Sequence, residues 1–193
     1  GMTTTIEKLH PMMQRAFNQL QSALQVDPNL SVASITYIGY RAPGSWDPNV
    51  IFQRLARNGG NIFASDISSF NAGRDVFTGE GHFRGNHIFA HSYGSTTALM
   101  ALASGRMRAD SLTVLGSPGS DVRSAADLAV GSGQVFVGDA HSDPVAGSGY
   151  FGTDPGATGF GSTVLDLTGG VDAQDAGDVF RRPVGHNDYL KPG

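Results

Sequence analysis

The sequence predicts an α/β domain, with a mostly parallel sheet of about five or six strands and helices on both faces. Short apolar segments alternate with helix-forming segments along most of the chain. A small-residue turn at residues 90–94 joins one of these strands to the next helix. The composition agrees, because 193 residues that are 39% hydrophobic and 16% charged are typical of one folded domain.

The chain is predicted to form a single domain over residues 1–193, with Gly1 ahead of Met2 as an expression remnant. The net charge of −4 is mild and the basic residues are scattered, so no nucleic acid or anionic membrane is expected as partner. There is no cysteine, which excludes disulfides and thiolate metal sites. We see no apolar run approaching the roughly 20 residues that span a bilayer and no signal segment at the start, so a soluble chain without a membrane span is expected, in a compartment left unknown.

The first half of the chain predicts helix, strand and helix. Apolar residues spaced by three and four over 6–24 predict a helix that buries one stripe against a sheet and ends at Asp27-Pro28. Residues 34–40 are rich in β-branched and aromatic side chains, which predicts a strand. Asp47-Pro48 predicts the start of a helix over 48–58 and Gly59-Gly60 its stop. A second helix is expected through residues 62–70, followed by a loop over 78–85.

The second half continues the alternation. Strands are predicted at 87–90, 111–115, 134–137 and 162–167, because these are short apolar runs bounded by turn residues. Helices are expected at 96–104, closed by Gly105, and at 124–128. Residues 147–161 are crowded with glycine and small polar residues and are expected to form a long loop.

The turn Ala90-His91-Ser92-Tyr93-Gly94 predicts a nucleophile. A sharp strand-to-helix turn lifts a serine hydroxyl clear of the sheet and aims helix-start amides at the reacting carbonyl, and it needs small residues two before and two after the serine. Ala90 in place of glycine adds only one methyl group. The alternative is that Ser92 is an ordinary helix cap.

An acid and a base follow Ser92 in the chain order that hydrolases of this fold use, serine, then aspartate, then histidine. The carboxylates after the 134–137 strand are Asp139 and Asp143, of which we favour Asp143, although an aspartate before proline is also a common turn starter. His186 is the histidine that follows the 162–167 strand, and its alternative is a surface role. The predicted catalytic residues are therefore Ser92, Asp143 and His186.

Further segments strengthen this interpretation. They are residues 37–43, 91–97, 116–119, 124–128, 143–145, 152–155 and 159–161, and His186 ahead of Tyr189-Leu190. Together they resemble the α/β-hydrolase domains of undefined function that are widespread in actinobacteria, over about residues 35–189. The resemblance implies the same three catalytic residues and no particular substrate.

The chain departs from that family at its N-terminus. Family members usually carry an apolar strand and a Pro-Gly loop before the first helix, and this loop gives one oxyanion amide, whereas only residues 1–5 precede Ile6 here. The N-terminal strand is thus either lacking or replaced by another segment. The amide of Tyr93 is the oxyanion donor we predict, and His91 and Trp46 are expected to line the substrate site, with packing as the alternative for Trp46.

The function expected from the sequence is a serine hydrolase that cleaves an ester, thioester or amide of a small-molecule or acyl substrate through an acyl-enzyme, without a cofactor. The alternative is a non-catalytic or conditionally active binding module, with an oligomer or partner completing the sheet. A weaker alternative is metal-dependent hydrolysis at Asp139, His141, Asp143 and Asp154, whose spacing matches no known metal motif, so no metal is predicted.

Overall fold

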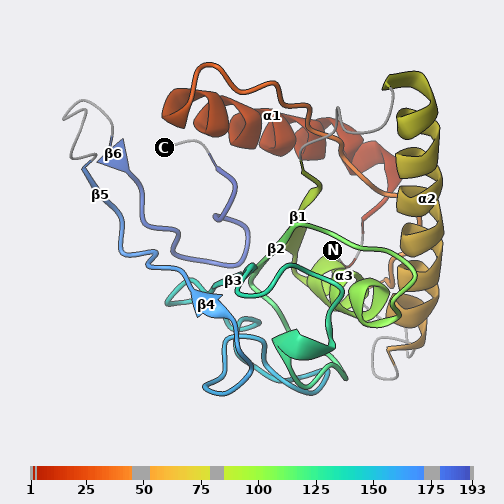
Figure 1. Ribbon diagram of the computed structural model, residues 1–193. Helices are drawn as coiled ribbons and strands as arrows, with labels where there is room; N and C mark the ends of the chain where they lie inside the picture. The colour runs from red at the N-terminus through yellow and green to blue at the C-terminus, as the bar shows by residue number, and fades with distance from the viewer. Residues whose placement is uncertain (1, 3, 45–52, 79–84, 172–178, 192–193) are drawn as a thin grey trace.

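The computed structural model describes residues 2, 4–44, 53–78, 85–171 and 179–191, and it has helices on both sides of a central sheet (Figure 1). None of the helices in these ranges combines the length and the apolar composition that crossing a membrane requires. The elements in chain order are a 3-10 helix η1 (Ile6–Lys8), α1 (Leu9–Val26), α2 (Arg54–Thr78), β1 (His87–His91), α3 (Tyr93–Ala103), β2 (Ser111–Leu115), a 3-10 helix η3 (Ala125–Asp127), β3 (Val135–Gly138), β4 (Thr163–Val164), β5 (Gly170–Val171) and β6 (Val179–Phe180).

The main sheet has four parallel strands in the order β1-β2-β3-β4, and β5 and β6 form a separate antiparallel pair. The register aligns the ends of neighbouring strands, with His91 beside Leu115 and Leu115 beside Gly138. Because the strands are parallel, the loops that follow β1, β2 and β3 leave the sheet at one edge. Side chains for a common site can therefore come from all three loops.

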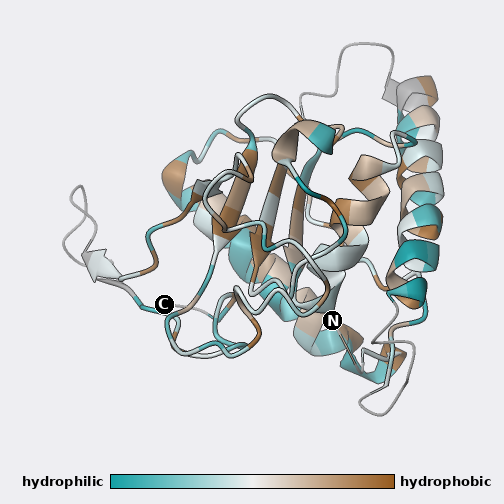
Figure 2. Cartoon of the chain, turned by 90° about the horizontal axis from the view of Figure 1, so that it is seen from below, coloured by the Kyte–Doolittle hydropathy of each residue, from teal (hydrophilic) through white to brown (hydrophobic). Residues whose placement is uncertain are grey.

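One face of the sheet is packed against α3, and α2 covers α3 on the outside. Alternate strand residues such as Ile88, Leu112 and Val137 point into this core, together with Leu99 and Leu102 of α3. In Figure 2 the hydrophobic colouring gathers on the strands and α3, while much of α2 is hydrophilic. This packed core therefore holds α3, and the turn that leads into it from β1, against the sheet.

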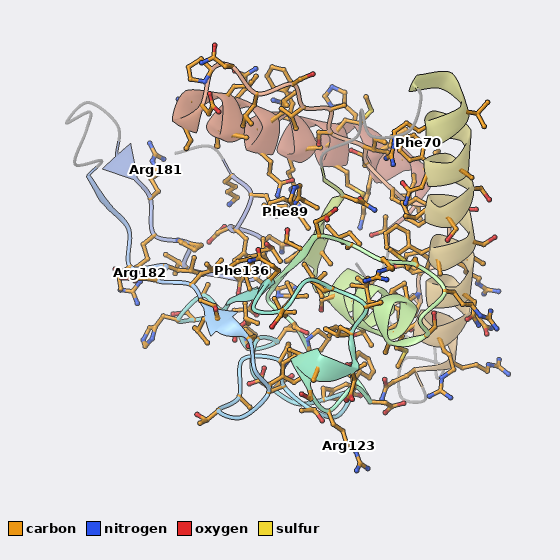
Figure 3. The ribbon with its side chains drawn as sticks, in the orientation of Figure 1. Phe70, Phe89, Arg123, Phe136, Arg181 and Arg182 are labelled. Atoms are coloured by element: carbon orange, nitrogen blue, oxygen red, sulfur yellow. The ribbon has the colours of Figure 1, made fainter. Side chains whose placement is uncertain are left out.

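The opposite face of the sheet is covered loosely by α1. Phe89 lies on the side of α1 (Figure 3), where it lines a groove with residues of that helix, and it is still 56% exposed. No α1 residue is buried, so the predicted apolar stripe does not pack tightly on the sheet. A groove of about 390 Å³ remains between α1, Phe89 and the segment 189–191.

The strand predicted over residues 34–40 is wrong, because the structure has no strand there. Side chains of this segment contact α2 instead. The Tyr37 ring lies 4.7 Å from that of Phe63, and its hydroxyl donates a 2.7 Å hydrogen bond to Asp66. With this segment outside the sheet, the main sheet has four strands within the described residues, where five or six were expected.

The helix stop predicted at Gly59-Gly60 is also wrong, because α2 continues through both residues. A Cβ atom on Gly60 would lie 3.1 Å from the amide nitrogen of Ala101, and one on Gly59 would lie 2.6 Å from the Tyr40 ring. The two glycines thus permit close packing, and this offsets their low helix propensity. The predicted helices at 48–58 and 62–70 are one helix, and Asp47-Pro48 lies outside the described residues.

The predictions for the second half of the chain agree better. The strands at 87–90, 111–115 and 134–137, the helix at 96–104 and the short helix at 124–128 are confirmed within a few residues. Of the 162–167 strand, only Thr163–Val164 pairs in the sheet. Residues 147–161 contain no helix or strand, as expected for a long loop. The β5–β6 pair was not predicted.

Candidate active site

Ser92 lies at the sharp turn between β1 and α3. Its backbone has φ 57° and ψ −135°, a conformation that costs a non-glycine residue about 1–3 kcal/mol. Its amide donates a 3.0 Å hydrogen bond to the carbonyl oxygen of Leu115. Strain of this kind is characteristic of a nucleophile elbow, in which the serine hydroxyl stands at the end of the sheet.

A buried group of hydroxyls holds this turn from below. The Ser95 hydroxyl donates to the carbonyl oxygen of Ser92 at 2.6 Å and lies 2.8 Å from the hydroxyl of Ser117. The Ser117 hydroxyl also accepts a hydrogen bond from the Gly119 amide at 3.2 Å. Ser95 and Ser117 are both 0% exposed, so these bonds are protected from water and fix the turn firmly.

Ser92, His186 and Asp143 are linked by hydrogen bonds. The Nε2 atom of His186 lies 2.7 Å from the Ser92 hydroxyl, and its Nδ1 atom lies 2.8 Å from one Asp143 oxygen and 3.0 Å from the other. These three residues are distant in the sequence, and the loops after β1, β3 and β6 bring them together. Asp139 makes no such contact, so of the two predicted acids it is Asp143 that reaches the histidine.

The Asp143 carboxylate is enclosed, with its side chain 0% exposed. It accepts hydrogen bonds from the Tyr189 hydroxyl at 2.6 Å and from the Val145 amide at 2.8 Å, besides its contact with His186. Burial raises the pKa of the Asp143 carboxyl, but these hydrogen bonds outweigh it and hold the pKa below its usual range. Asp143 is therefore ionised at neutral pH.

His91 lies directly against the His186 turn. Its Nε2 atom is 2.6 Å from the backbone carbonyl oxygen of His186, and the two rings have their centroids 4.7 Å apart. Burial, together with the neighbouring His186, lowers the pKa of His91 to about 4. Since a carbonyl only accepts, Nε2 carries the proton of a neutral ring. A substrate contact by His91 stays a prediction, and Trp46 lies outside the described residues.

Tyr93 begins α3 directly after Ser92. Its amide therefore belongs to the first turn of α3. Its ring is buried and meets the ring of Phe151 edge-on at 5.5 Å. The Tyr93 amide directly follows Ser92 in the chain, and its role as oxyanion donor stays a prediction.

Gly116 follows β2 and lies under the hydrogen-bonded group. A Cβ atom there would be 2.6 Å from an Asp143 oxygen and 3.1 Å from the Nδ1 atom of His186. The backbone at Gly116 has φ +56°, which also favours glycine. Any side chain at this position would push the acid and the histidine apart.

The aspartates near the site do not form a metal centre. Across the described ranges, no three histidine, aspartate or glutamate side chains come together in a way that would hold a metal ion. Burial, with the nearby charges of Asp154 and Asp143, raises the pKa of Asp139 to about 6. One Asp139 oxygen has no hydrogen-bond partner among the described residues. Asp139 is thus a half-buried carboxyl close to two other carboxylates.

Sequence reasoning missed the contacts of Tyr189, Gly116, Ser95 and Ser117. The Tyr189 hydroxyl donates to Asp143 and accepts from the amide of Ala140 at 2.8 Å. Each of these residues stands in a segment, 91–97, 116–119 or 186–190, that the sequence had already marked. The signal was thus present as a motif, but it did not reveal which side chains meet.

A family model described as alpha/beta hydrolase matches residues 1–153. The chain belongs to this alpha/beta hydrolase family. The matched range contains the Ser92 elbow and Asp143, and it ends before His186. For an alpha/beta hydrolase, the parallel sheet and the turn from β1 to α3 are the expected framework.

The curated relatives of this alpha/beta hydrolase are mycobacterial. Uncharacterized proteins from two strains of Mycobacterium tuberculosis, CDC 1551 and H37Rv, are each 34% identical over 194 residues, which cover 95% of this chain and 29% of theirs. An uncharacterized protein of Mycobacterium bovis is 33% identical over 141 residues, 72% of this chain and 48% of its own. The chain therefore spans less than half the length of these relatives. No solved structure matches it significantly.

Proposed function

We propose that this alpha/beta hydrolase is a serine hydrolase that cleaves an ester, thioester or amide bond through an acyl-enzyme on Ser92. The observation that carries the proposal is the continuous hydrogen-bonded path from the Ser92 hydroxyl to His186 at 2.7 Å and on to Asp143 at 2.8 Å. This is the arrangement of nucleophile, base and orienting acid that acyl transfer uses on several unrelated folds.

In the first half of the reaction, Nε2 of His186 takes the proton of Ser92 as the hydroxyl oxygen attacks the substrate carbonyl carbon. Asp143 stabilises the resulting imidazolium through Nδ1 and keeps the ring in the required orientation. The tetrahedral intermediate then collapses, and His186 gives the proton to the leaving group. A water molecule, deprotonated by His186, then attacks the acyl carbon; the bond to the Ser92 oxygen breaks, His186 returns the proton to Ser92, and the acid product leaves.

The negative oxygen of the intermediate requires hydrogen-bond donors. The Tyr93 amide is the donor we assign, because it follows the nucleophile at the start of α3. Loss of one oxyanion donor typically lowers turnover by about 10²–10³. A chain with only this amide would therefore react slowly with esters while still reacting with strongly electrophilic probes.

The direct test uses a fluorophosphonate, which phosphonylates activated serines. We expect the protein to be labelled between about pH 6 and 9. Ser92→Ala should abolish labelling. The matched control, Ser22→Ala at an exposed hydroxyl on α1, should leave it unchanged. Absence of labelling in folded wild-type protein would refute the proposal.

The alternative function is a conditionally active module that needs a further segment or partner. The observation that favours it is that β1 pairs only with β2 among the described residues, while the strand-like segment 34–40 is unpaired. The discriminating measurement is the labelling rate of this chain against that of the full-length mycobacterial relative. A rate at least about 100-fold higher in the longer protein, the size of one lost oxyanion donor, would favour the alternative.

A further inference from the structure

The turn that carries His186 is stabilised by hydrogen bonds within residues 184–188. Asp188 accepts hydrogen bonds from the amides of Gly185 at 2.8 Å and Val184 at 3.3 Å, and its own amide donates to the carbonyl of Gly185 at 3.0 Å. These bonds are local, so they define the turn but not its place against the sheet. Contacts with other elements must therefore position His186 relative to Ser92.

The first of these contacts comes from His91, the last residue of β1. The bond from its Nε2 to the His186 carbonyl, at 2.6 Å, ties the turn to the strand that precedes Ser92. The ring also contacts those of His186 and Tyr189, with centroid distances of 4.7 Å and 5.6 Å. Because the His91 ring is neutral, it adds a donor without competing with His186 for the charge of Asp143.

The second contact comes from Tyr189. Its hydroxyl accepts from the Ala140 amide at 2.8 Å and donates to Asp143 at 2.6 Å, which links the turn to the loop after β3. That loop is also joined to the turn region by the Ser142 amide, which donates to the carbonyl of Val184 at 3.2 Å. The segment 184–189 thus carries His186 and also contacts Asp143 and its loop.

We propose that His91 and Tyr189 are positioning residues of the active site, His91 holding the base through its backbone carbonyl and Tyr189 holding the acid through its carboxylate. The proposal rests on the proposed function and extends it, because it assigns His91 to the catalytic base rather than to the substrate. A shift of about 1 Å in a catalytic group can lower a rate by about 10²-fold, so these contacts are sufficient to control the reaction.

The test separates the His91 hydrogen bond from its packing. His91→Phe keeps a ring but removes the donor, and we expect it to lower the fluorophosphonate labelling rate by about 10- to 100-fold. His91→Gln places an amide N–H near the position of Nε2 and should recover most of the lost rate. Tyr189→Phe should lower the rate about tenfold. The control is His87→Phe at the far end of β1, whose rate should stay at the wild-type value.

Two results would overturn the positioning role. Wild-type labelling by His91→Phe, with an unchanged KM for a p-nitrophenyl ester, would show that only packing matters. Wild-type labelling with a raised KM for that ester would instead assign His91 to substrate binding. Thermal unfolding of each variant identifies any loss of rate that comes from unfolding.

A second readout does not require activity. In nuclear magnetic resonance spectra, the proton on Nδ1 of His186 should give a protected downfield signal in wild type and in His91→Gln, and should broaden in His91→Phe. If wild-type protein is not labelled, the proposed function fails, and this signal still decides the positioning role. An unchanged signal in His91→Phe would contradict it.

Discussion

The two faces of the sheet differ in how closely they are packed. On the α3 face, Leu99 and Leu102 are 0% exposed and the elbow rests on buried hydroxyls. On the α1 face, Phe17 of α1 and Phe89 of β1 are each more than half exposed. Ser92, the proposed nucleophile, therefore belongs to the tightly packed part of the molecule.

His186 belongs to the loosely packed part, on the side of α1. His186 and Tyr189 stand on a turn beyond the small β5–β6 pair, and the adjoining Leu190 accepts a 3.4 Å hydrogen bond from Asn18 of α1. The proposed active site thus joins Ser92, on a tightly packed turn, to His186, whose position depends on a few specific contacts. We therefore expect mutations near His186 to change the reaction rate more than the stability. Mutations in the core between α3 and the sheet should change the stability more than the rate.

The largest effect on the labelling rate is expected at Gly116, which follows β2 and lies against Asp143 and His186. Gly116→Ala would place a Cβ atom 2.6 Å from Asp143 and 3.1 Å from His186, so the labelling rate should fall at least about 100-fold. The matched control is Gly133→Ala, which has a similar φ of +72° with no atom within 4 Å. It should cost some stability and leave the rate intact. Equal rates for the two variants would contradict this geometry.

The packing difference itself is tested by two truncations, measured by urea unfolding. Leu99→Ala removes a fully buried side chain of α3 and should lower the free energy of unfolding by about 2–5 kcal/mol. Phe17→Ala on α1 removes a side chain that is 51% exposed and should cost less than about 1 kcal/mol. Similar losses in both variants would show that α1 is packed as firmly as α3.

The smallest effect is expected at Asp139. Its pKa is about 6 in the folded protein and about 3.9 in an unfolded chain, so the folded state binds more protons between these values and its stability falls as the pH rises through them. Asp139→Asn should therefore raise the free energy of unfolding at pH 8 by roughly 1 kcal/mol, after allowance for solvent screening, and leave it unchanged near pH 4. A loss of stability at pH 8 would show that the Asp139 carboxylate has a structural partner.

The sequence predicted the second half of the fold better than the first, for a physical reason. Strand propensity reports whether side chains suit a pleated surface, not whether a neighbouring strand is present. The 111–115 segment has neighbours on both sides and forms β2, whereas 34–40 has none among the described residues and packs on α2. Gly59-Gly60 resembled a helix stop because its packing role depends on α3, which is far along the chain.

The candidate site was predictable to the extent that chain order determines it. Ser92, Asp143 and His186 follow the order that the fold imposes, and the structure brings these residues within hydrogen-bond distance. The contacts of His91 and Tyr189 were not predictable, because they depend on where a loop with few sequence constraints lies against the sheet. The catalytic roles of Ser92, Asp143 and His186 stay predictions.

The most direct measurement of the central claim is to trap the acyl-enzyme. The protein is mixed with p-nitrophenyl acetate, quenched in acid during the first turnover and digested, and the acetylated peptide is identified by mass spectrometry. We predict an acetyl group on Ser92, formed with a burst of nitrophenolate and absent in Ser92→Ala. Nitrophenolate release that persists unchanged in Ser92→Ala, with no acetyl group on Ser92 in the wild type, would contradict the account.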